Sequence, residues 1–375
     1  MPEVVRLKIC FVSSTIYPLY NPLVRAPYGG AEAQIFEIAR FFGKDEEMEI
    51  SVVTGNYEQQ EVEFYSGVLV YRADLETPKS LFHRFVPSSS AIHKILKKVD
   101  AQTYIMSGAC GLTKDVAEFC VRNNRSFVYR ISHQRDCDGS FVHGNGEEGE
   151  RFQWALHHAH QIICQTETQK NLLQRTEQLK AQVIPNVIPL FPPSSAPRDE
   201  IIWVGQAVEW KQPELFLRLA LTLPNHNFTM IVMPRDLAYL ERLVEKTRNV
   251  SNLGFENSAP YQEMPACYEN AKLLVNTSRF EGFPYSFTQA LAAGVPIAAL
   301  NVDPDGILEH KQMGVCARGS EVRLAQAVND LLSFERQWKS YSRNAMLYVE
   351  ENQSFKSLET VYRKLFMRCY RAPKR

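Results

Sequence analysis

KLLVNTSRFEGFPYSFTQALAAGVPIAAL, residues 272–300, contains the most informative pattern of the sequence for the architecture of the chain. An apolar segment, 272–276, leads through a loop with Gly and Pro into a helix of small residues and then into a second apolar segment, 297–300. Short apolar runs on either side of a helix are typical of buried parallel strands. The stretch therefore predicts an α/β unit whose helix N-terminus, with its exposed backbone N–H groups, forms an anion site.

The same alternation extends over the rest of the chain. Predicted strands lie at 7–13, 50–54, 103–106, 127–131, 161–165 and 182–184, and then at 201–204 and 228–233. Predicted helices lie at 35–42 and 114–123 and begin again at Pro213, a residue suited to the first turn. Four prolines between 188 and 198 indicate a linker. We therefore expect two α/β halves that face each other across a cleft, with ligands beyond the carboxyl ends of the strands.

Composition narrows the class of protein. Lys plus Arg and Asp plus Glu both number 42 in 375 residues. The chain therefore lacks the excess of basic residues that is typical of a nucleic-acid binder. No apolar run reaches the ~20 residues that span a bilayer, and a strand is expected directly after the polar N-terminus, as in a cytoplasmic protein. The eight cysteines are scattered without metal-ligand spacing, so we expect reduced and mostly buried thiols.

The loop within 272–300 resembles the signature of retaining glycosyltransferases of the GT-B fold, family 4. That signature has a Glu, seven residues and a second Glu, and the chain supplies Glu281-Gly282-Phe283-Pro284 in register with Ala290, Ala292, Gly294 and Pro296. Gln289 stands where the second Glu is expected and where the family contacts the donor ribose. An amide can still form hydrogen bonds there, but it lacks the charge that strengthens them.

A second segment, 202–211, is similar to the family's "VGR…K" element, whose Arg and Lys hold the donor diphosphate. Gly205 and Lys211 match that element, and Gln206 replaces the Arg. One cation in place of two leaves the leaving group less neutralised, although a nearby Arg could substitute. By this resemblance the donor-binding residues are Gly205, Gln206, Lys211, Glu281, Gly282, Phe283, Pro284, Tyr285, Ser286 and Gln289.

The resemblance is patchier in the first half. Gly29, Gly30 and Glu32 are similar to the family's "GG-x-E" loop, which faces the donor diphosphate or the acceptor, and 184–187 resembles its "IPNG" element. His133 is the candidate for a histidine that contacts the donor sugar, and with Lys211 and Glu281 it completes the expected catalytic set. A loop histidine bonded to the backbone is the alternative.

Taken together, the resemblance implies a metal-independent hexosyltransferase of the GT-B fold. Residues 1–188 would bind the acceptor, 189–198 link the domains, 199–352 bind the nucleotide sugar, and 353–375 form a helix that packs back on the first domain. The donor would be a UDP- or GDP-sugar and the acceptor a glycan, a lipid-linked sugar or a small molecule, as in polysaccharide biosynthesis. No cofactor, metal or nucleic-acid partner is expected.

Several other interpretations stay open. Gln206 and Gln289 also fit a weakened glycosyltransferase-like protein that binds or regulates without turnover. A glycoside hydrolase needs two facing carboxylates, and an NAD-dependent dehydrogenase needs G-x-G-x-x-G after a strand; neither pattern is evident. The triplet 136–138 (DCD) and the histidines at 157, 158 and 160 could hold a metal, or be ordinary loop and helix-surface residues. The basic amphipathic stretch 81–99 suits peripheral contact with the inner membrane face or an ordinary core-facing helix.

Overall fold

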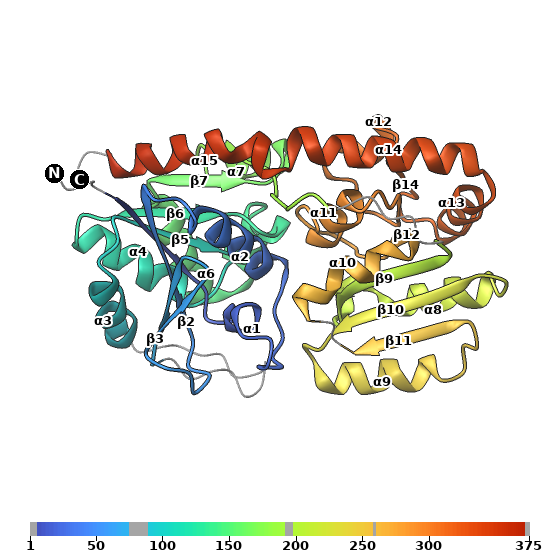
Figure 1. Cartoon of the computed structure of the whole chain (residues 1–375), viewed down its shortest axis with the longest axis horizontal. Helices are drawn as coiled ribbons and strands as arrows, with labels where there is room; N and C mark the ends of the chain where they lie inside the picture. The colour runs from blue at the N-terminus through green and yellow to red at the C-terminus, as the bar shows by residue number, and fades with distance from the viewer. Residues whose placement is uncertain (1–5, 75–88, 192–197, 258–259, 372–375) are drawn as a thin grey trace. The chain divides into compact units, whose positions relative to one another are not determined.

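The computed structural model describes residues 6–74, 89–191, 198–257 and 260–371. Two compact units make up the chain: the first comprises residues 1–187 and 358–375, and the second comprises 188–357. Each unit is an α/β domain built on its own largely parallel sheet (Figure 1). The predicted fold class, α/β with two Rossmann-like units, is confirmed.

The sheet of the first unit has eight strands in the order β3-β4-β2-β1-β5-β6-β7-β8, and all but β3 run parallel. From the central strand β1 the chain proceeds outward in one direction and then, from β5, in the other. This doubly wound order creates a switch point between β1 and β5, where the connections diverge at the carboxyl edge. The strands are β1 (Leu7–Val12), β2 (Met48–Thr54), β3 (Val62–Tyr65), β4 (Val68–Arg72), β5 (Thr103–Ser107), β6 (Ser126–Arg130), β7 (Gln161–Cys164) and β8 (Gln182–Val183).

Helices cover both faces of this sheet. Alternate strand residues such as Tyr104 and Phe127 pack with α3, α4, α6 and α7 in one buried core. The helices of the unit's first segment are α1 (Tyr17–Tyr20), α2 (Gly30–Phe42), α3 (Ser89–Val99), α4 (Leu112–Arg122), the 3₁₀ helix η1 (Gln134–Asp136), α5 (Ser140–Gly144), α6 (Gly146–His157) and α7 (Glu167–Thr176).

The C-terminal helix α15 (Phe355–Tyr370) contributes its residues from Leu358 onward to the first unit. The Phe42 ring of α2 lies 6.0 Å from the Tyr362 ring and 5.2 Å from the Phe366 ring. Near the helix end, the Ser126 hydroxyl of β6 donates to the Cys369 carbonyl at 2.6 Å. Sequence positions more than three hundred residues apart therefore share one core.

The second unit has a six-stranded parallel sheet in the order β11-β10-β9-β12-β13-β14. Numbered within the unit this is 3-2-1-4-5-6, the doubly wound order, and its switch point lies between β9 and β12. The strands are β9 (Glu200–Gln206), β10 (Asn227–Met233), β11 (Leu253–Asn257), β12 (Ala271–Asn276), β13 (Ile297–Ala299) and β14 (Gly314–Cys316).

One face of this sheet packs against α8, α9 and α13 in a core centred on Phe216, Phe228 and Trp203. Helix α11 contacts β13, α10 and α14. The helices are η2 (Glu209–Lys211), α8 (Pro213–Thr222), α9 (Leu237–Thr247), η3 (Tyr261–Glu263), α10 (Met264–Glu269), α11 (Tyr285–Ala292), η4 (Pro304–Gly306), α12 (Ile307–His310), α13 (Glu321–Ser333) and α14 (Glu335–Asn352).

Several of the sequence predictions include residues outside the described ranges, among them residues 372–375 of the predicted C-terminal segment 353–375. Of the predicted linker 189–198, residues 192–197 lie outside them, and so do residues 81–88 of the basic amphipathic stretch. The rest of that stretch is α3, whose Ile92 and Leu96 are fully buried in the core of the first unit, as the core-facing interpretation requires. Among the described residues, no helix combines the length and apolarity needed to cross a bilayer.

Candidate functional site

The switch point of the second sheet brings two loops together. The loop after β9 contains η2 with Lys211, and the loop after β12 contains Glu281. Because β9 and β12 are adjacent and parallel, their carboxyl ends lie at the same edge of the sheet. The sequence therefore places a lysine and a glutamate, 70 positions apart in the chain, at the point where doubly wound sheets bind their ligands.

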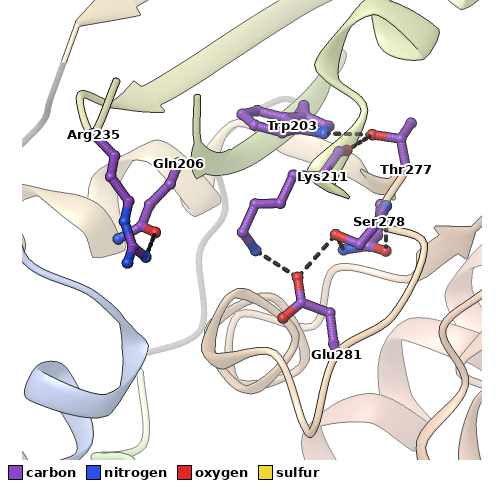
Figure 2. A network of polar contacts seen from close by, with 8 residues as sticks. Trp203, Gln206, Lys211, Arg235, Thr277, Ser278 and Glu281 are labelled. Atoms are coloured by element: carbon purple, nitrogen blue, oxygen red, sulfur yellow. Dashed lines mark hydrogen bonds and ion pairs between the residues drawn. The ribbon is translucent and has the colours of Figure 1, made fainter. Parts of the chain in front are cut away.

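Lys211 and Glu281 form an ion pair across this switch point, with 2.5 Å between Nζ and Oε1 (Figure 2). The Ser278 hydroxyl donates to the same carboxylate oxygen at 2.9 Å. Only 17% of the Lys211 side chain and 9% of the Glu281 side chain are exposed. A charged pair with so little solvent contact, and with a third group holding the carboxylate, has a defined geometry.

Buried hydrogen bonds anchor the backbone that carries Lys211. The Trp203 indole N–H donates to the Thr277 hydroxyl at 2.9 Å, and that hydroxyl donates to the Lys211 carbonyl at 2.6 Å (Figure 2). Gly205 leaves room for this arrangement, because a Cβ there would lie 2.8 Å from the Trp203 ring and 3.1 Å from Lys211 Cδ. The glycine is thus required by close approach of its own neighbours.

Helix α11 begins at Tyr285, shortly after Glu281 in the chain, with Pro284 at its N-cap. Its first N–H groups point out of the helix N-terminus at the carboxyl edge of the sheet, where they favour an anion. The side chains of Phe283 and Tyr285 are buried, and the Tyr285 and Tyr261 hydroxyls lie 2.9 Å apart. In this segment the backbone and the half-buried Ser286 are therefore better placed to meet a ligand than the aromatic rings are.

Gln289 points into the interior of the second unit. Its side chain is buried, and its Oε1 accepts a hydrogen bond of 3.3 Å from the Tyr268 hydroxyl. The amide oxygen that would meet a ribose thus has an internal partner.

Gln206, at the end of β9, has an arginine beside it. Arg235 follows β10, and its Nη1 donates to Gln206 Oε1 at 2.9 Å (Figure 2). The Arg235 guanidinium carbon also lies 5.7 Å from the centre of the Trp210 ring, a cation–π distance. The neighbouring strand therefore supplies a cation next to the position where the sequence has an amide.

Gly29, Gly30 and Glu32 form the N-terminus of α2, at the carboxyl end of β1 in the first unit. The Glu32 carboxylate accepts from the Gly29 N–H at 2.9 Å and from the Thr15 hydroxyl at 2.8 Å. These bonds are those of a capping box, so Glu32 orders the loop and the helix start. The loop lies at the switch point of its own sheet.

His133 follows β6 and caps η1, where its Nδ1 accepts from the Arg135 N–H at 3.2 Å. The neighbouring Asp136 is buried, and its carboxylate accepts from the N–H groups of Ser132 and His133 and from the Tyr129 hydroxyl. Burial raises the pKa of Asp136, while these hydrogen bonds act against the rise. The first carboxylate of the 136–138 triplet therefore holds a turn.

The histidines at 157, 158 and 160 likewise have structural contacts. His157 Nε2 lies 3.3 Å from the Glu177 carboxylate, and His158 stacks on Trp154 with 3.8 Å between ring centroids. The His160 ring accepts from the Phe127 N–H at 3.5 Å. Within the described ranges, no group of three or more His, Cys, Asp or Glu side chains is arranged to hold a metal ion.

The predicted residues thus fall into separate groups. Gly205, Gln206, Lys211, Glu281 and the start of α11 share the carboxyl edge of the second sheet, whereas the glycine loop and His133 belong to the first unit. Sequence reasoning missed Trp203, Thr277, Ser278 and Arg235. Ser278 was detectable by its spacing of three residues from Glu281, but the other contacts depend on which strands lie side by side.

Comparison with known proteins is consistent with this geometry. Residues 198–333, which lie within the second unit, match the family model described as "Glycosyl transferases group 1". A search of curated protein sequences found no significant match to the chain.

Solved structures resemble the chain over nearly its whole length. Sucrose-phosphate synthase from Thermosynechococcus elongatus aligns with a TM-score of 0.75 and 14% identity, covering 96% of this chain and 100% of its own. A TarM mutant from S. aureus, in complex with fondaparinux, alpha-GlcNAc-glycerol and UDP, aligns at 0.71 and 13%, covering 96% and 99%. WaaG, a glycosyltransferase involved in lipopolysaccharide biosynthesis, aligns at 0.68 and 14%, covering 96% and 99%. At these identities the likeness establishes the fold, GT-B.

Proposed function

We propose that this protein is a retaining glycosyltransferase that moves a hexose from a nucleoside diphosphate donor to an acceptor hydroxyl. The observation that carries the proposal is the Lys211–Glu281 ion pair at the switch point of the second sheet. The match of residues 198–333 to the glycosyl transferases group 1 model supports it independently. The donor would bind to the second unit, and the acceptor to the first.

Each group at this edge has a chemical role in the proposed reaction. Lys211 would bind the diphosphate and stabilise the charge that grows on it as the sugar leaves. The α11 N-terminus would add backbone N–H donors to the same phosphates. Glu281, held by Ser278, would accept hydrogen bonds from the sugar hydroxyls and orient the ring.

Retention follows if the acceptor attacks the face from which the diphosphate departs. The bond between the anomeric carbon and the phosphate oxygen breaks, and a bond from that carbon to the acceptor oxygen forms on the same side. The departing phosphate oxygen takes the acceptor's proton, so a separate protein base is unnecessary. The protein's contribution is position and charge stabilisation, which are large terms in such transfers. Positive side chains, rather than a resident metal ion, would neutralise the diphosphate.

The donor is proposed to be a UDP- or GDP-sugar. A UDP-sugar is the first candidate to test, because the similar TarM structure contains UDP. The acceptor would be a glycan, a lipid-linked sugar or a small molecule. WaaG acts in lipopolysaccharide biosynthesis, which makes polysaccharide assembly the first process in which to search for the acceptor.

A panel of UDP, GDP, ADP and their hexose conjugates tests the donor class. A ligand that binds the folded chain raises its melting temperature with the logarithm of concentration over the dissociation constant. We expect one base to shift the melting temperature of the chain while the others do not. Incubation with the matching sugar nucleotide and candidate acceptors should then give a product with the donor's anomeric configuration. If no diphosphate shifts melting and no sugar is transferred, the proposal is wrong.

A second function is favoured by the internal contact of Gln289 with Tyr268. If that amide no longer meets a ribose, the chain would bind nucleotides weakly and serve as a binding or regulatory protein. The two functions differ in turnover: the regulatory protein would show a melting shift with a nucleotide sugar but no release of the nucleoside diphosphate over many hours.

A further inference from the structure

The charge balance at the donor edge of the second unit is incomplete if Lys211 is its only cation. Lys211 is paired with Glu281 at 2.5 Å, so the pair as a whole carries no net charge. A nucleoside diphosphate leaving group carries at least two negative charges, and a neutral pair offsets them poorly. A second positive group at the same edge would resolve this imbalance.

Arg235 is a cation in the required place. The strand register pairs Met233 of β10 with Gln206 of β9, which brings the two strand ends side by side. Arg235 lies two residues beyond Met233, and its guanidinium points toward the Gln206 side chain next to the loop that carries Lys211 (Figure 2). The arginine and the lysine therefore lie in the segments that follow two adjacent strands, at the same edge of the sheet.

The surroundings of Arg235 hold its position without cancelling its charge. Its contacts within the described part of the chain are the neutral Gln206 amide oxygen, at 2.9 Å, and the face of Trp210. Two other arginines of the unit are neutralised instead: Arg218 pairs with Glu321 and Arg318 with Glu309. An arginine oriented by an amide and an aromatic ring keeps its planar donors available for a phosphate.

We propose that Arg235 is the second cation of the diphosphate site, and that Gln206 is the positioning residue that holds it. The site would thus bind the diphosphate from two strand ends, with Lys211 after β9 and Arg235 after β10. This inference rests on the proposed donor chemistry and goes beyond it by assigning the residue that replaces the missing charge at position 206.

Binding titrations with the diphosphates UDP, GDP and ADP, and with the corresponding monophosphates, test this assignment. For the diphosphate that binds, Arg235→Ala should weaken affinity by about 10- to 100-fold, the usual effect of losing a charged hydrogen bond. The monophosphate should lose less, because it has fewer oxygens to neutralise. Arg242→Ala is the matched control: Arg242 lies 5.7 Å from the Tyr239 ring, as Arg235 does from Trp210, but it belongs to α9 and should leave affinity unchanged.

Two further variants separate charge from structure. Gln206→Glu keeps an acceptor for Arg235 and strengthens that contact, yet it cancels the positive charge, so diphosphate affinity should fall while the melting temperature holds or rises. Gln206→Arg placed in the Arg235→Ala background moves the cation to β9 and should restore affinity to within about threefold of the wild type, since the charge returns to the same edge.

The outcomes of these titrations separate a failure of the Arg235 assignment from a failure of the proposed function. If Lys211→Ala loses diphosphate binding while Arg235→Ala binds like the wild type, the donor site stands and the role of Arg235 is refuted. Unchanged affinity in Gln206→Glu would also overturn it. If the wild-type chain binds none of the three diphosphates, the proposed function fails, and the assignment of Arg235 fails with it.

Discussion

Lys211 and Glu281 combine low exposure with opposite charge, so each depends on the other. Removing one partner of such a pair leaves a poorly solvated charge behind, whereas replacing it by an isostere keeps the local hydrogen bonds. The Ser278 hydroxyl remains to stabilise Glu281 when the lysine is lost. The functional effect should therefore exceed the structural one.

We predict that Lys211→Ala and Glu281→Ala each lower the rate of sugar transfer by about a hundredfold or more, the range seen when one charge-stabilising group is removed. Both variants should stay folded, as checked by circular dichroism and melting. Glu281→Gln, which keeps the shape and the contact with Ser278, should lose less than Glu281→Ala. Lys246→Ala provides the control, since Lys246 pairs with Glu214 on the surface of the same unit. Near-normal transfer in both alanine variants would remove the site assignment.

Gly205 is predicted to tolerate no side chain. A Cβ there would meet the buried and hydrogen-bonded Trp203 ring at 2.8 Å, and a rigid ring cannot move aside cheaply. Gly205→Ala should lower the free energy of unfolding by about 1–3 kcal/mol, as overpacking does, and should weaken diphosphate binding by shifting Lys211. Gly144→Ala is the comparison, because nothing lies within 4 Å of the added methyl group there. Equal urea midpoints for the two variants would contradict the prediction.

At the level of single elements, the packing of α15 is expected to contribute much of the stability of the first unit. Phe366 is 1% exposed and packs on Phe42 of α2. Phe366→Ala should cost about 3–5 kcal/mol of unfolding free energy. The exposed Lys364 on the same helix gives the control, Lys364→Ala, with a change within about 0.5 kcal/mol. Chemical denaturation of the whole chain measures both, and a Phe366→Ala midpoint equal to that of the control would show that α15 contributes little.

Elements with continuous apolar runs were predictable from the sequence. Buried parallel strands such as β1, β6 and β10 were predicted to within one or two residues, and α8 begins at Pro213 as expected. The hairpin β3–β4 was missed, because its half-exposed strands alternate rather than run apolar. Ser66 and Gly67 both have positive φ, the conformation of a two-residue hairpin turn, so the Ser-Gly pair was the available signal.

The residues of the candidate site also fall into two groups: those that the sequence identifies and those that it does not. Lys211 and Glu281 stand in local motifs that the sequence displays, and the loops that carry them adjoin strands that periodicity identifies. Arg235 could not be selected, because its proximity to Gln206 depends on the pairing of β9 with β10. Strand order is a property of the whole sheet, and no short window of sequence contains it.

Over the whole molecule, the reactivity of the eight cysteines measures how well the core of each unit excludes solvent. All are free thiols; Cys10, Cys120, Cys137, Cys164 and Cys369 are buried, and Cys110, Cys267 and Cys316 are more accessible. Burial raises the pKa of Cys10 to about 12 and that of Cys267 to about 11. Since the thiolate is the reactive form, raised pKa values slow reaction at neutral pH.

We predict that a thiol reagent at pH 8 modifies at most three cysteines of the native chain, and all eight in denaturant. Raising the pH toward 10 should speed the labelling of Cys267 and Cys316, because the thiolate fraction grows as the pH approaches the raised pKa. Peptide mass mapping identifies the sites. Rapid native labelling of Cys10 or Cys120 would show that the core of the first unit opens.

The discontinuity of the first unit has a consequence for biosynthesis. Residues 358–375 complete that unit, yet a ribosome must translate all of 188–357 before it reaches them. At roughly 5–20 residues per second the delay is on the order of ten to thirty seconds. During translation, the hydrophobic surface around Phe42 stays uncovered until α15 emerges. The first unit, whose synthesis begins before that of the second, therefore completes its core only after the second unit has been made.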